Sequence, residues 1–218
     1  MNKGENPMLV MSGTIGAGKT SLTQLVADHF GSKAFYESVD DNPILPLFYK
    51  DPKKYAFLLQ IYFLNKRLGS IKSAFANDLD VLDRSIFEDS LLFHLNGDLG
   101  RATSTEVDIY DSLLDNMMQE LPEAEHQKSP DLLIHINISF ETMLKRIQKR
   151  GRSYEQIDQD PDLYKYYETL NDRYAQWYAN YDHSPKMQID GDQLDFVADS
   201  DARDQVIKLI DDKVASLA

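Results

Sequence analysis

A glycine-rich segment at residues 13–20 constrains the fold of this chain more than any other feature. Its sequence, Gly-Thr-Ile-Gly-Ala-Gly-Lys-Thr, satisfies the phosphate-binding pattern G-x-x-x-x-G-K-[ST]. An apolar run at 8–11 precedes the segment, and apolar residues at helical spacing follow it over 22–30. In this order of strand, turn and helix, backbone N–H groups and the helix N-terminus can surround a phosphate. The segment predicts an α/β fold that binds a nucleoside triphosphate.

Different residues of this loop contact different parts of the triphosphate. Glycines let consecutive N–H groups curl around the β-phosphate, Lys19 reaches the β- and γ-oxygens, and the Thr20 hydroxyl can ligate Mg²⁺. We expect ATP to bind at Gly13, Thr14, Ile15, Gly16, Ala17, Gly18, Lys19, Thr20 and Ser21.

Strand and helix patterns alternate along the rest of the chain. Apolar runs predict strands at 8–12, 34–36, 79–82, 131–138 and 186–189. Longer helical patterns are found at 18–30, 53–76, 84–96, 104–121, 139–150, 160–181 and 202–216. This alternation predicts a five-stranded parallel sheet with helices on both faces, in a single domain over residues 1–218. Ligands of such sheets bind at the carboxyl ends of the strands.

Composition limits the partners of the protein. The chain has 218 residues and a formal net charge of −13, which disfavours nucleic acid and anionic membranes as partners. It has no cysteine, and no apolar stretch approaches the roughly 20 residues of a membrane span. We therefore expect a cytoplasmic protein that binds neither nucleic acid nor membrane. The five histidines lack the spacing of metal ligands.

Charged residues follow the predicted strands, where the triphosphate must lie. Glu37 follows the second strand, and Asp83 and Arg84 follow the third. Glu37 can accept a hydroxyl proton, Asp83 can hold Mg²⁺ together with Thr20, and Arg84 can bridge acceptor and phosphate. Three arginines gather after the fourth strand, on a helix and the glycine-containing turn after it: Arg146, Arg150 and Arg152. They predict an arginine-rich lid, at about 146–156, that closes on the transferring phosphoryl group.

These residues resemble the deoxynucleoside kinases, and most closely the bacterial deoxyadenosine/deoxyguanosine kinases. The resemblance runs from the phosphate loop to Asp190 and is most specific in the strings at 36–43 (YESVDDNP) and 58–65 (LLQIYFLN). It implies a P-loop kinase fold, ATP and Mg²⁺ as cofactors, and a small-molecule deoxynucleoside as substrate. It also implies a homodimer and feedback inhibition by the end-product triphosphate.

The resemblance assigns roles by position. Glu37 matches the carboxylate that activates the 5′-hydroxyl, and Tyr49 and Glu155 match the pair that holds the 3′-hydroxyl. The remaining matches are Gln60 with the base-binding glutamine, Phe87 with the base-stacking region, Asp83-Arg84-Ser85 with the acidic-Arg-Ser motif, Arg146, Arg150 and Arg152 with the lid arginines, and Asp190 with the end of the ATP site. Asp83 stands where many relatives have the longer Glu.

Two more positions bear on the choice of base. Arg67 and Asp89 match the Arg/Asp pair of the deoxycytidine and deoxyguanosine kinases. A carboxylate can accept a hydrogen bond from an exocyclic amine, which thymine lacks, and a glutamine amide can pair with an adenine edge. The alternative interpretation of Asp89 is a structural ion pair with Arg67, because a buried carboxylate needs a partner.

The leading hypothesis is ATP-dependent phosphorylation of the 5′-hydroxyl of a purine deoxynucleoside, deoxyadenosine or deoxyguanosine, with deoxycytidine as a further acceptor. The predicted catalytic residues are Glu37, Arg84, Lys19, Arg146 and Arg150. One alternative is a nucleoside monophosphate kinase, which would need extra cations for the acceptor phosphate. Another is a nucleotide-dependent regulatory module with little turnover.

Overall fold

The computed structural model describes residues 8–36, 41–74, 80–119, 129–158 and 161–217. Its strands form one parallel sheet with the order β2-β3-β1-β4-β5. The strands are β1 (Leu9–Gly13), β2 (Lys33–Phe35), β3 (Asp80–Asp83), β4 (Leu132–Asn137) and β5 (Lys186–Asp190). The five-stranded parallel sheet expected from the sequence is confirmed.

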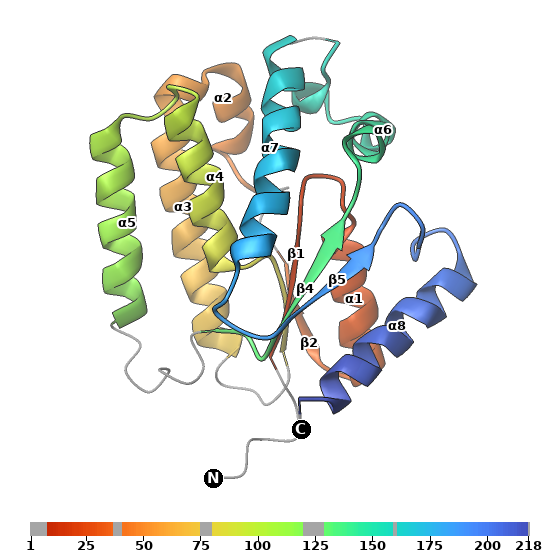
Figure 1. Ribbon diagram of the computed structural model, residues 1–218. Helices are drawn as coiled ribbons and strands as arrows, with labels where there is room; N and C mark the ends of the chain where they lie inside the picture. Colours follow the sequence, from red (N-terminus) through yellow and green to blue (C-terminus); the bar gives the residue numbers. More distant parts are fainter. Residues whose placement is uncertain (1–7, 37–40, 75–79, 120–128, 159–160, 218) are drawn as a thin grey trace.

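Helices cover both faces of this sheet, as the alternating pattern predicts. In Figure 1, α1 (Lys19–Phe30) and α8 (Ser200–Ala215) lie to the right of the sheet. On the other side lie α3 (Pro52–Ala74), α4 (Ile86–Asp98) and α5 (Ser104–Gln119). The remaining helical elements are α2 (Leu45–Lys50), α6 (Phe140–Arg150), the 3₁₀ turn η2 (Ser153–Glu155) and α7 (Pro161–Asn180).

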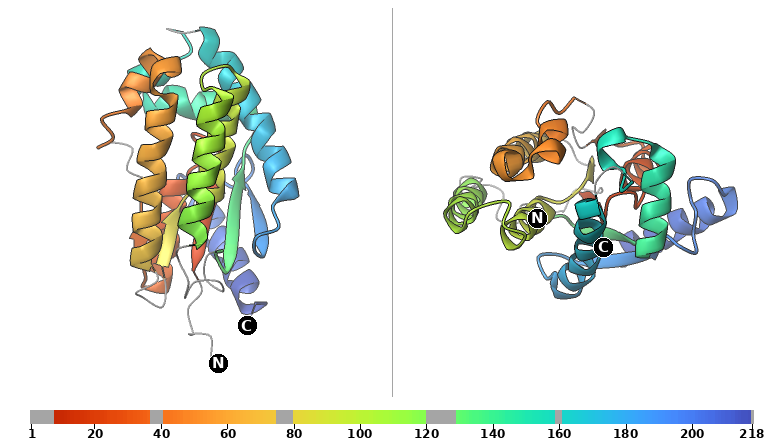
Figure 2. Two further views of the ribbon diagram at one scale, coloured as in Figure 1. Left: turned by 90° about the vertical axis from the view of Figure 1, so that its left-hand side faces the viewer. Right: turned by 90° about the horizontal axis from the view of Figure 1, so that it is seen from above.

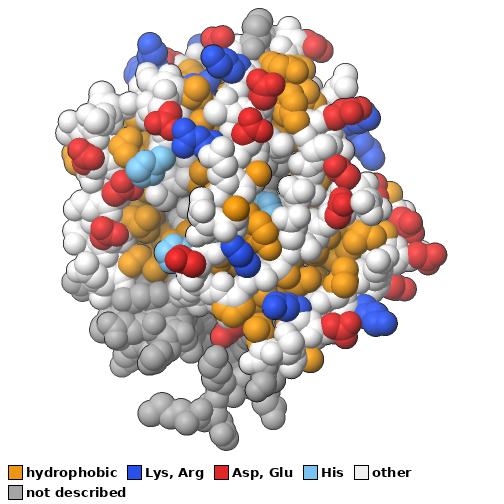
Figure 3. All heavy atoms as spheres, in the orientation of Figure 1, with side chains coloured by type: hydrophobic (Ala, Val, Ile, Leu, Met, Phe, Trp, Pro, Cys, Tyr) orange, Lys and Arg blue, Asp and Glu red, His pale blue; other side chains and the backbone are white. Residues whose placement is uncertain are grey.

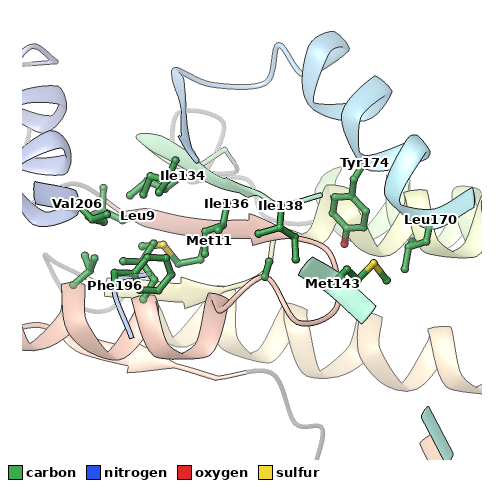
Figure 4. Packing of buried hydrophobic residues seen from close by; sticks show 14 of the residues in the cluster. Leu9, Met11, Ile134, Ile136, Ile138, Met143, Leu170, Tyr174, Phe196 and Val206 are labelled. Atoms are coloured by element: carbon green, nitrogen blue, oxygen red, sulfur yellow. The ribbon is translucent and has the colours of Figure 1, made fainter. Parts of the chain in front are cut away.

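Two apolar clusters hold the layers together. The side chains of β1 alternate between them, so that Leu9 and Met11 enter one cluster and Val10 enters the other. Figure 4 shows the first cluster, in which strand residues meet side chains of the C-terminal part of the chain: Leu9, Met11, Ile134, Ile136, Phe196 and Val206. The second cluster packs Val10, Leu82 and Leu133 against α3, α4 and α5. Burial on both faces explains the nearly continuous apolar sequence of β4.

The strand order determines where a ligand can bind. Strand β1 is central, with β3 on one side and β4 on the other. The connections that follow β3 and β4 therefore start on opposite sides of β1, and a crevice forms outside the carboxyl end of β1. In Figure 1 these strand ends point upward, toward α2, α6 and the upper part of α7. Viewed from above (Figure 2), α2 and α6 lie on opposite sides of the segment that begins α1.

Two local features differ from the sequence-based expectation. Helix α2 was not expected, because six residues are too few to display a helical period. The Asn42 side chain supports its start by accepting hydrogen bonds from the backbone N–H of Ile44 and Leu45. Helix α4 begins at Ile86 and not at residue 84, since Arg84 has a positive φ of 88° and Ser85 is the N-cap.

The surface carries charges of both signs. On the face shown in Figure 3, Asp and Glu side chains are interspersed with Lys and Arg. Within the described ranges, no helix is both long enough and apolar enough to cross a membrane.

Candidate active site

A cavity of about 1030 Å³ opens at the carboxyl ends of the strands. Its walls come from the phosphate loop, α2, α3, the turn after β3, the α6–η2 segment and α7. Besides Ile15, Gly16, Gly18 and Ser21 of the loop, ten residues with a predicted function line it together: Lys19, Thr20, Tyr49, Gln60, Asp83, Arg84, Arg146, Arg150, Arg152 and Glu155. Residues far apart in the sequence thus share one space.

The phosphate loop has the backbone geometry that its glycines predict. Gly13 has a φ of 147°, and a Cβ there would lie 2.7 Å from the carbonyl oxygen of Ile136 in β4. Gly18 has a φ of 100°, and a Cβ there would lie 3.1 Å from the Phe196 ring. A side chain at either position would strain the backbone and push β4 or Phe196 away. The glycines therefore maintain both the loop shape and its close contact with the sheet.

Lys19 begins α1 at the floor of the cavity, and its side chain is largely buried. Its Nζ donates hydrogen bonds to the carbonyl oxygens of Gly13 at 2.8 Å and Thr14 at 3.0 Å. The ammonium group is thus held above the loop by the loop itself. A cation at this point, together with the N–H groups at the start of α1, favours a bound polyphosphate.

Thr20 and Asp83 lie side by side across the end of the sheet. The Thr20 hydroxyl donates to Asp83 Oδ2 at 2.6 Å. The other carboxylate oxygen, Oδ1, is buried and makes no hydrogen bond with any part of the chain that the structure describes. One hydroxyl and one carboxylate next to a phosphate site suit Mg²⁺, which usually keeps several waters and binds substrate phosphates as its other ligands. The two residues therefore fit the predicted metal role, and the short side chain of Asp83 still reaches the Thr20 hydroxyl.

Arg84 occupies an unusual backbone conformation beside Asp83. Its φ of 88° is rare for a residue with a Cβ, and its N–H donates to the carbonyl oxygen of Met11 in β1. The guanidinium donates to the Tyr174 hydroxyl at 2.6 Å and lies 4.0 Å from a carboxylate oxygen of Glu88. Arg84 is buried and lines the cavity, so its charge faces the space where a phosphoryl group would lie.

The three lid arginines have different partners. Arg146 in α6 donates to the carbonyl oxygens of Ala17 at 3.0 Å and Gly191 at 2.7 Å, so it connects the phosphate loop with the end of β5. Arg150, at the end of the same helix, donates to Glu155 Oε2 at 2.5 Å. Arg152 lies 3.5 Å from the other oxygen of Glu155. One arginine therefore links the lid to the donor side, and the other two pair with Glu155, which lies in the lid itself.

Glu155 and Tyr49 form part of the wall opposite the phosphate loop. Tyr49 makes a hydrogen bond with Tyr167, whose hydroxyl donates to the Glu155 carbonyl oxygen at 3.1 Å. Burial, with smaller contributions from the neighbouring Tyr167, Tyr166 and Glu155, raises the pKa of Tyr49 well above its ordinary value. Tyr49 therefore remains a neutral hydrogen-bond donor at any physiological pH, next to a carboxylate. This pairing suits a ligand hydroxyl.

Gln60 is a buried amide in the cavity wall. Its side chain is 3% exposed, and its Oε1 has no hydrogen-bond partner among the described residues. Its neighbours in the wall are mainly apolar: Leu45, Phe48, Leu59 and Phe63. A buried amide oxygen without a partner costs free energy, which a ligand with a hydrogen-bond donor can recover. An aromatic base fits between such apolar walls.

Arg67 and Asp89 form a buried ion pair behind this wall. The Arg67 Nε lies 3.1 Å from Asp89 Oδ2, and the same guanidinium donates to the Asp83 carbonyl oxygen at 2.7 Å. Neither side chain is among those that line the cavity. The geometry agrees with the structural ion pair, the second of the two interpretations that the sequence left open.

Phe87 and Asp190, which were also predicted as site residues, do not line the cavity, and nor do Gly13, Thr14 and Ala17 of the loop. Phe87 stacks on His183 with 3.9 Å between ring centroids, outside the cavity. Leu92 and Asn96 of the same helix do line it, and at 100° per residue Phe87 is turned about 140° and 180° away from them. Asp190 accepts hydrogen bonds from the N–H groups of Asp192 and Gln193, so it shapes the turn after β5.

Several residues that line the cavity were not predicted from the sequence. In the loop after β5 it is Asp195, Val197 and Ala198 that line the cavity, in place of Asp190. Tyr166, Leu170 and Tyr174 line it from α7 at a spacing of four residues. That spacing marks one helix face, but the same pattern is typical of core packing. Glu37 lies outside the described residues; Tyr36, the residue before it, lines the cavity.

The phosphate loop lies at the end of a parallel sheet and faces an arginine-rich segment and a wall suited to hydroxyls and a base. This combination defines a P-loop kinase of small molecules. Comparison with known proteins gives the family. The family model described as deoxynucleoside kinase matches residues 9–215, nearly the whole chain. The chain therefore belongs to the deoxynucleoside kinase family.

Individual relatives agree with this assignment. The chain is 60% identical to a deoxyguanosine kinase of Lactobacillus johnsonii over 203 residues, covering 93% of this chain and 90% of that protein. It is 53% identical to a deoxyadenosine kinase of Lactobacillus acidophilus, covering 96% and 97% of the two chains. Among solved structures, the deoxyadenosine kinase from M. mycoides with bound dATP has a TM-score of 0.76 at 30% identity, covering 95% of this chain and 99% of that one.

Proposed function

We propose that this kinase transfers the γ-phosphoryl group of ATP to the 5′-hydroxyl of a purine deoxynucleoside. The observation that carries the proposal is the shared cavity: Lys19 and Thr20 lie at one end, and Gln60 and Glu155 lie in the opposite wall. The relatives named deoxyguanosine kinase and deoxyadenosine kinase support a purine as the base.

Each residue of the cavity has a task in this proposal. Lys19 and the start of α1 hold the β- and γ-phosphates, and Thr20 and Asp83 hold Mg²⁺, which neutralises phosphate charge when it is bound. Arg84 and the lid arginine Arg150 stabilise the charge of the transferring group. The apolar wall around Gln60 receives the base.

The acceptor hydroxyls are positioned by the other end of the wall. Tyr49 and Glu155 hold the 3′-hydroxyl, with Glu155 as the acceptor of its proton, which orients the 5′-hydroxyl toward the phosphates. Glu37 removes the proton of the 5′-hydroxyl; this role rests on the resemblance in sequence. A carboxylate such as Glu155 in the acceptor wall disfavours a nucleotide acceptor, whose phosphate it would repel.

The test is a competition assay with ATP, Mg²⁺ and all four deoxynucleosides in one mixture. We expect dGMP and dAMP as the main products, with less dCMP. A mixture that yields only dTMP, or no monophosphate, would refute the proposal. Parallel reactions with dGMP and dAMP as acceptors would reveal a nucleoside monophosphate kinase by the appearance of diphosphates.

We also propose that the protein is a homodimer. Leu58 of α3 and Ile109 of α5 are 48% and 52% exposed, on two helices that pack against each other at the outside of the molecule. Exposed apolar side chains on adjacent helices favour a self-complementary contact. Light scattering should give about twice the chain mass of 25.0 kDa, and Leu58→Lys with Ile109→Lys should reduce it.

A further inference from the structure

Glu88 is a buried carboxylate next to the phosphate loop. It is the third residue of α4, and its side chain is completely buried. Its Oε2 accepts a hydrogen bond from the N–H of Ser85 at 2.8 Å, and Ser85 in turn caps the helix, so the two residues form a capping box. A carboxylate can cap a helix while it is exposed on the surface, so the capping role does not explain why Glu88 is completely buried.

The second oxygen of Glu88 reaches the donor site. Oε1 accepts from the N–H of Gly13 at 3.2 Å, at the first position of the phosphate loop. The same oxygen lies 4.0 Å from Nη1 of Arg84. One carboxylate therefore touches both the phosphate loop and the Asp83-Arg84-Ser85 turn, which are about 70 residues apart in the chain.

The surrounding charges explain how an anion is tolerated here. Burial raises the pKa of Glu88, while Arg84 and Lys19 oppose that shift. Both of these cations line the cavity at the end where the phosphates would lie. Glu88 therefore lies behind them, on the protein side, where it can orient their charges without meeting the substrate.

Arg84 in particular needs such support. Its backbone has a positive φ, which costs free energy for a residue with a Cβ and persists only where the surroundings enforce it. Its guanidinium is held from one side by the Tyr174 hydroxyl at 2.6 Å and faces Glu88 on another. Without the carboxylate, the guanidinium would lose the anion that helps to fix its direction.

We propose that Glu88 is a positioning residue for phosphoryl transfer, which fixes Arg84 and the first residue of the phosphate loop relative to each other. The inference rests on the proposed kinase function. Misplacing a catalytic group by about 1 Å can cost a factor of 10² in rate, so a residue outside the cavity can control turnover.

The substitution Glu88→Gln separates this role from helix capping. Glutamine preserves the capping box, because its amide oxygen accepts from the same N–H group, but it removes the charge opposite Arg84 and turns an NH2 group toward the N–H of Gly13. The matched control is Glu106→Gln. Glu106 accepts from the N–H of Thr103 at 2.7 Å in the capping box of α5, on the surface and outside the cavity.

We expect Glu88→Gln to lower kcat about 10- to 100-fold for a purine deoxynucleoside, with both KM values within about threefold of wild type. Glu106→Gln should leave kcat unchanged. In an Arg84→Ala background, Glu88→Gln should have a smaller effect than in wild type, since the part that acts through Arg84 is already lost. Glu88→Asp keeps the charge and should retain more of kcat than Glu88→Gln.

The outcomes are distinct. If wild type phosphorylates deoxynucleosides and Glu88→Gln has the same kcat, the positioning role is refuted and the carboxylate only caps α4. Full additivity with Arg84→Ala, or a Glu88→Asp variant slower than Glu88→Gln, also refutes it. A wild-type protein that makes no nucleoside monophosphate refutes the proposed function instead.

Discussion

The donor half and the acceptor half of the cavity differ in how their polar groups are held. The donor half comprises the phosphate loop and the turn after β3; Lys19, Thr20 and Arg84 in it all have partners within the protein. The acceptor half is the wall with Tyr49, Gln60 and Glu155, in which the Gln60 oxygen is buried without a partner among the described residues. The donor half is thus preorganised by the fold and keeps one carboxylate oxygen of Asp83 for a metal ion, whereas the acceptor half keeps an amide oxygen for a base.

The two halves therefore make different contributions to catalysis, to the stability of the folded protein and to the choice of base. A preorganised donor site gains catalytic power because its dipoles need not reorient during the reaction. An acceptor wall with an unpaired amide gives up stability, which the correct base restores on binding. We therefore expect the charge at the phosphates to control turnover and the acceptor wall to control substrate preference, with a stability effect in each half; four predictions test this.

The largest effect is expected in the donor half, for Lys19→Met. Methionine keeps the unbranched side chain but removes the charge that faces the β- and γ-phosphates. We expect kcat to fall about 10³-fold, the size of effect seen when a cation at a transferring phosphoryl group is removed. Steady-state turnover with ATP and deoxyguanosine measures it, with the exposed Lys208→Met as the control. A Lys19→Met variant within tenfold of wild type would mean that the loop is not the donor site.

The next effect concerns the boundary between the halves. Glu155→Gln removes the charge that pairs with Arg150 and with the substrate 3′-hydroxyl. A hydrogen bond to a charged group is worth about 1.5–3 kcal/mol, so wild type should favour a 2′-deoxynucleoside over its 2′,3′-dideoxy analogue by about 10- to 100-fold in kcat/KM. In Glu155→Gln this preference should fall to a few-fold. An undiminished preference would show that Glu155 does not hold the 3′-hydroxyl.

The donor half could be predicted from a local residue pattern, whereas the acceptor roles of Tyr49, Gln60 and Glu155 came only from the family resemblance, for a physical reason. The phosphate loop is continuous, and its glycines, Lys19 and Thr20 have roles fixed by local backbone geometry. The acceptor wall draws single residues from α2, α3, η2 and α7, and their orientation depends on helix rotation. Phe87 illustrates this, because the correct helix was identified while the side chain faces His183.

The donor half also contains features that depend on tertiary contacts and could not be predicted from the sequence. Glu88 in the sequence is only the last residue of a capping box, and its bond to Gly13 depends on the pairing of β1 with β3. The six residues of α2 and the contact of Asp195 with the cavity likewise depend on tertiary packing. The fold class was predictable because each strand and helix carries its own hydrophobic period.

A moderate effect is expected for Gln60→Leu in the acceptor half. Leucine is similar in size and leaves no unpaired oxygen in the wall, so the unliganded protein should gain about 1 kcal/mol in free energy of unfolding. Loss of the hydrogen bond to the base should raise KM for deoxyguanosine by tens-fold, since the base edge is then left unpaired. Urea denaturation and initial-rate kinetics measure the two effects. A destabilised variant would contradict the idea that the acceptor wall gives up stability for binding.

The smallest effect concerns the cost of preorganising the donor half. His135 of β4 hydrogen-bonds Ser12 beside the phosphate loop; burial, and to a lesser extent the charge of Lys19, lowers its pKa to about 3. The unfolded chain, with an ordinary histidine pKa near 6.5, binds a proton first, so stability falls as the pH decreases below that value. Between pH 7.5 and 5.5 this histidine should cost about 1 kcal/mol. His135→Gln should remove that part of the loss, as measured by the difference between urea denaturation curves at the two pH values. An equal loss in both proteins would mean that His135 is not held neutral by the fold, whereas a smaller loss in the variant would locate part of the acid sensitivity directly beneath the triphosphate site.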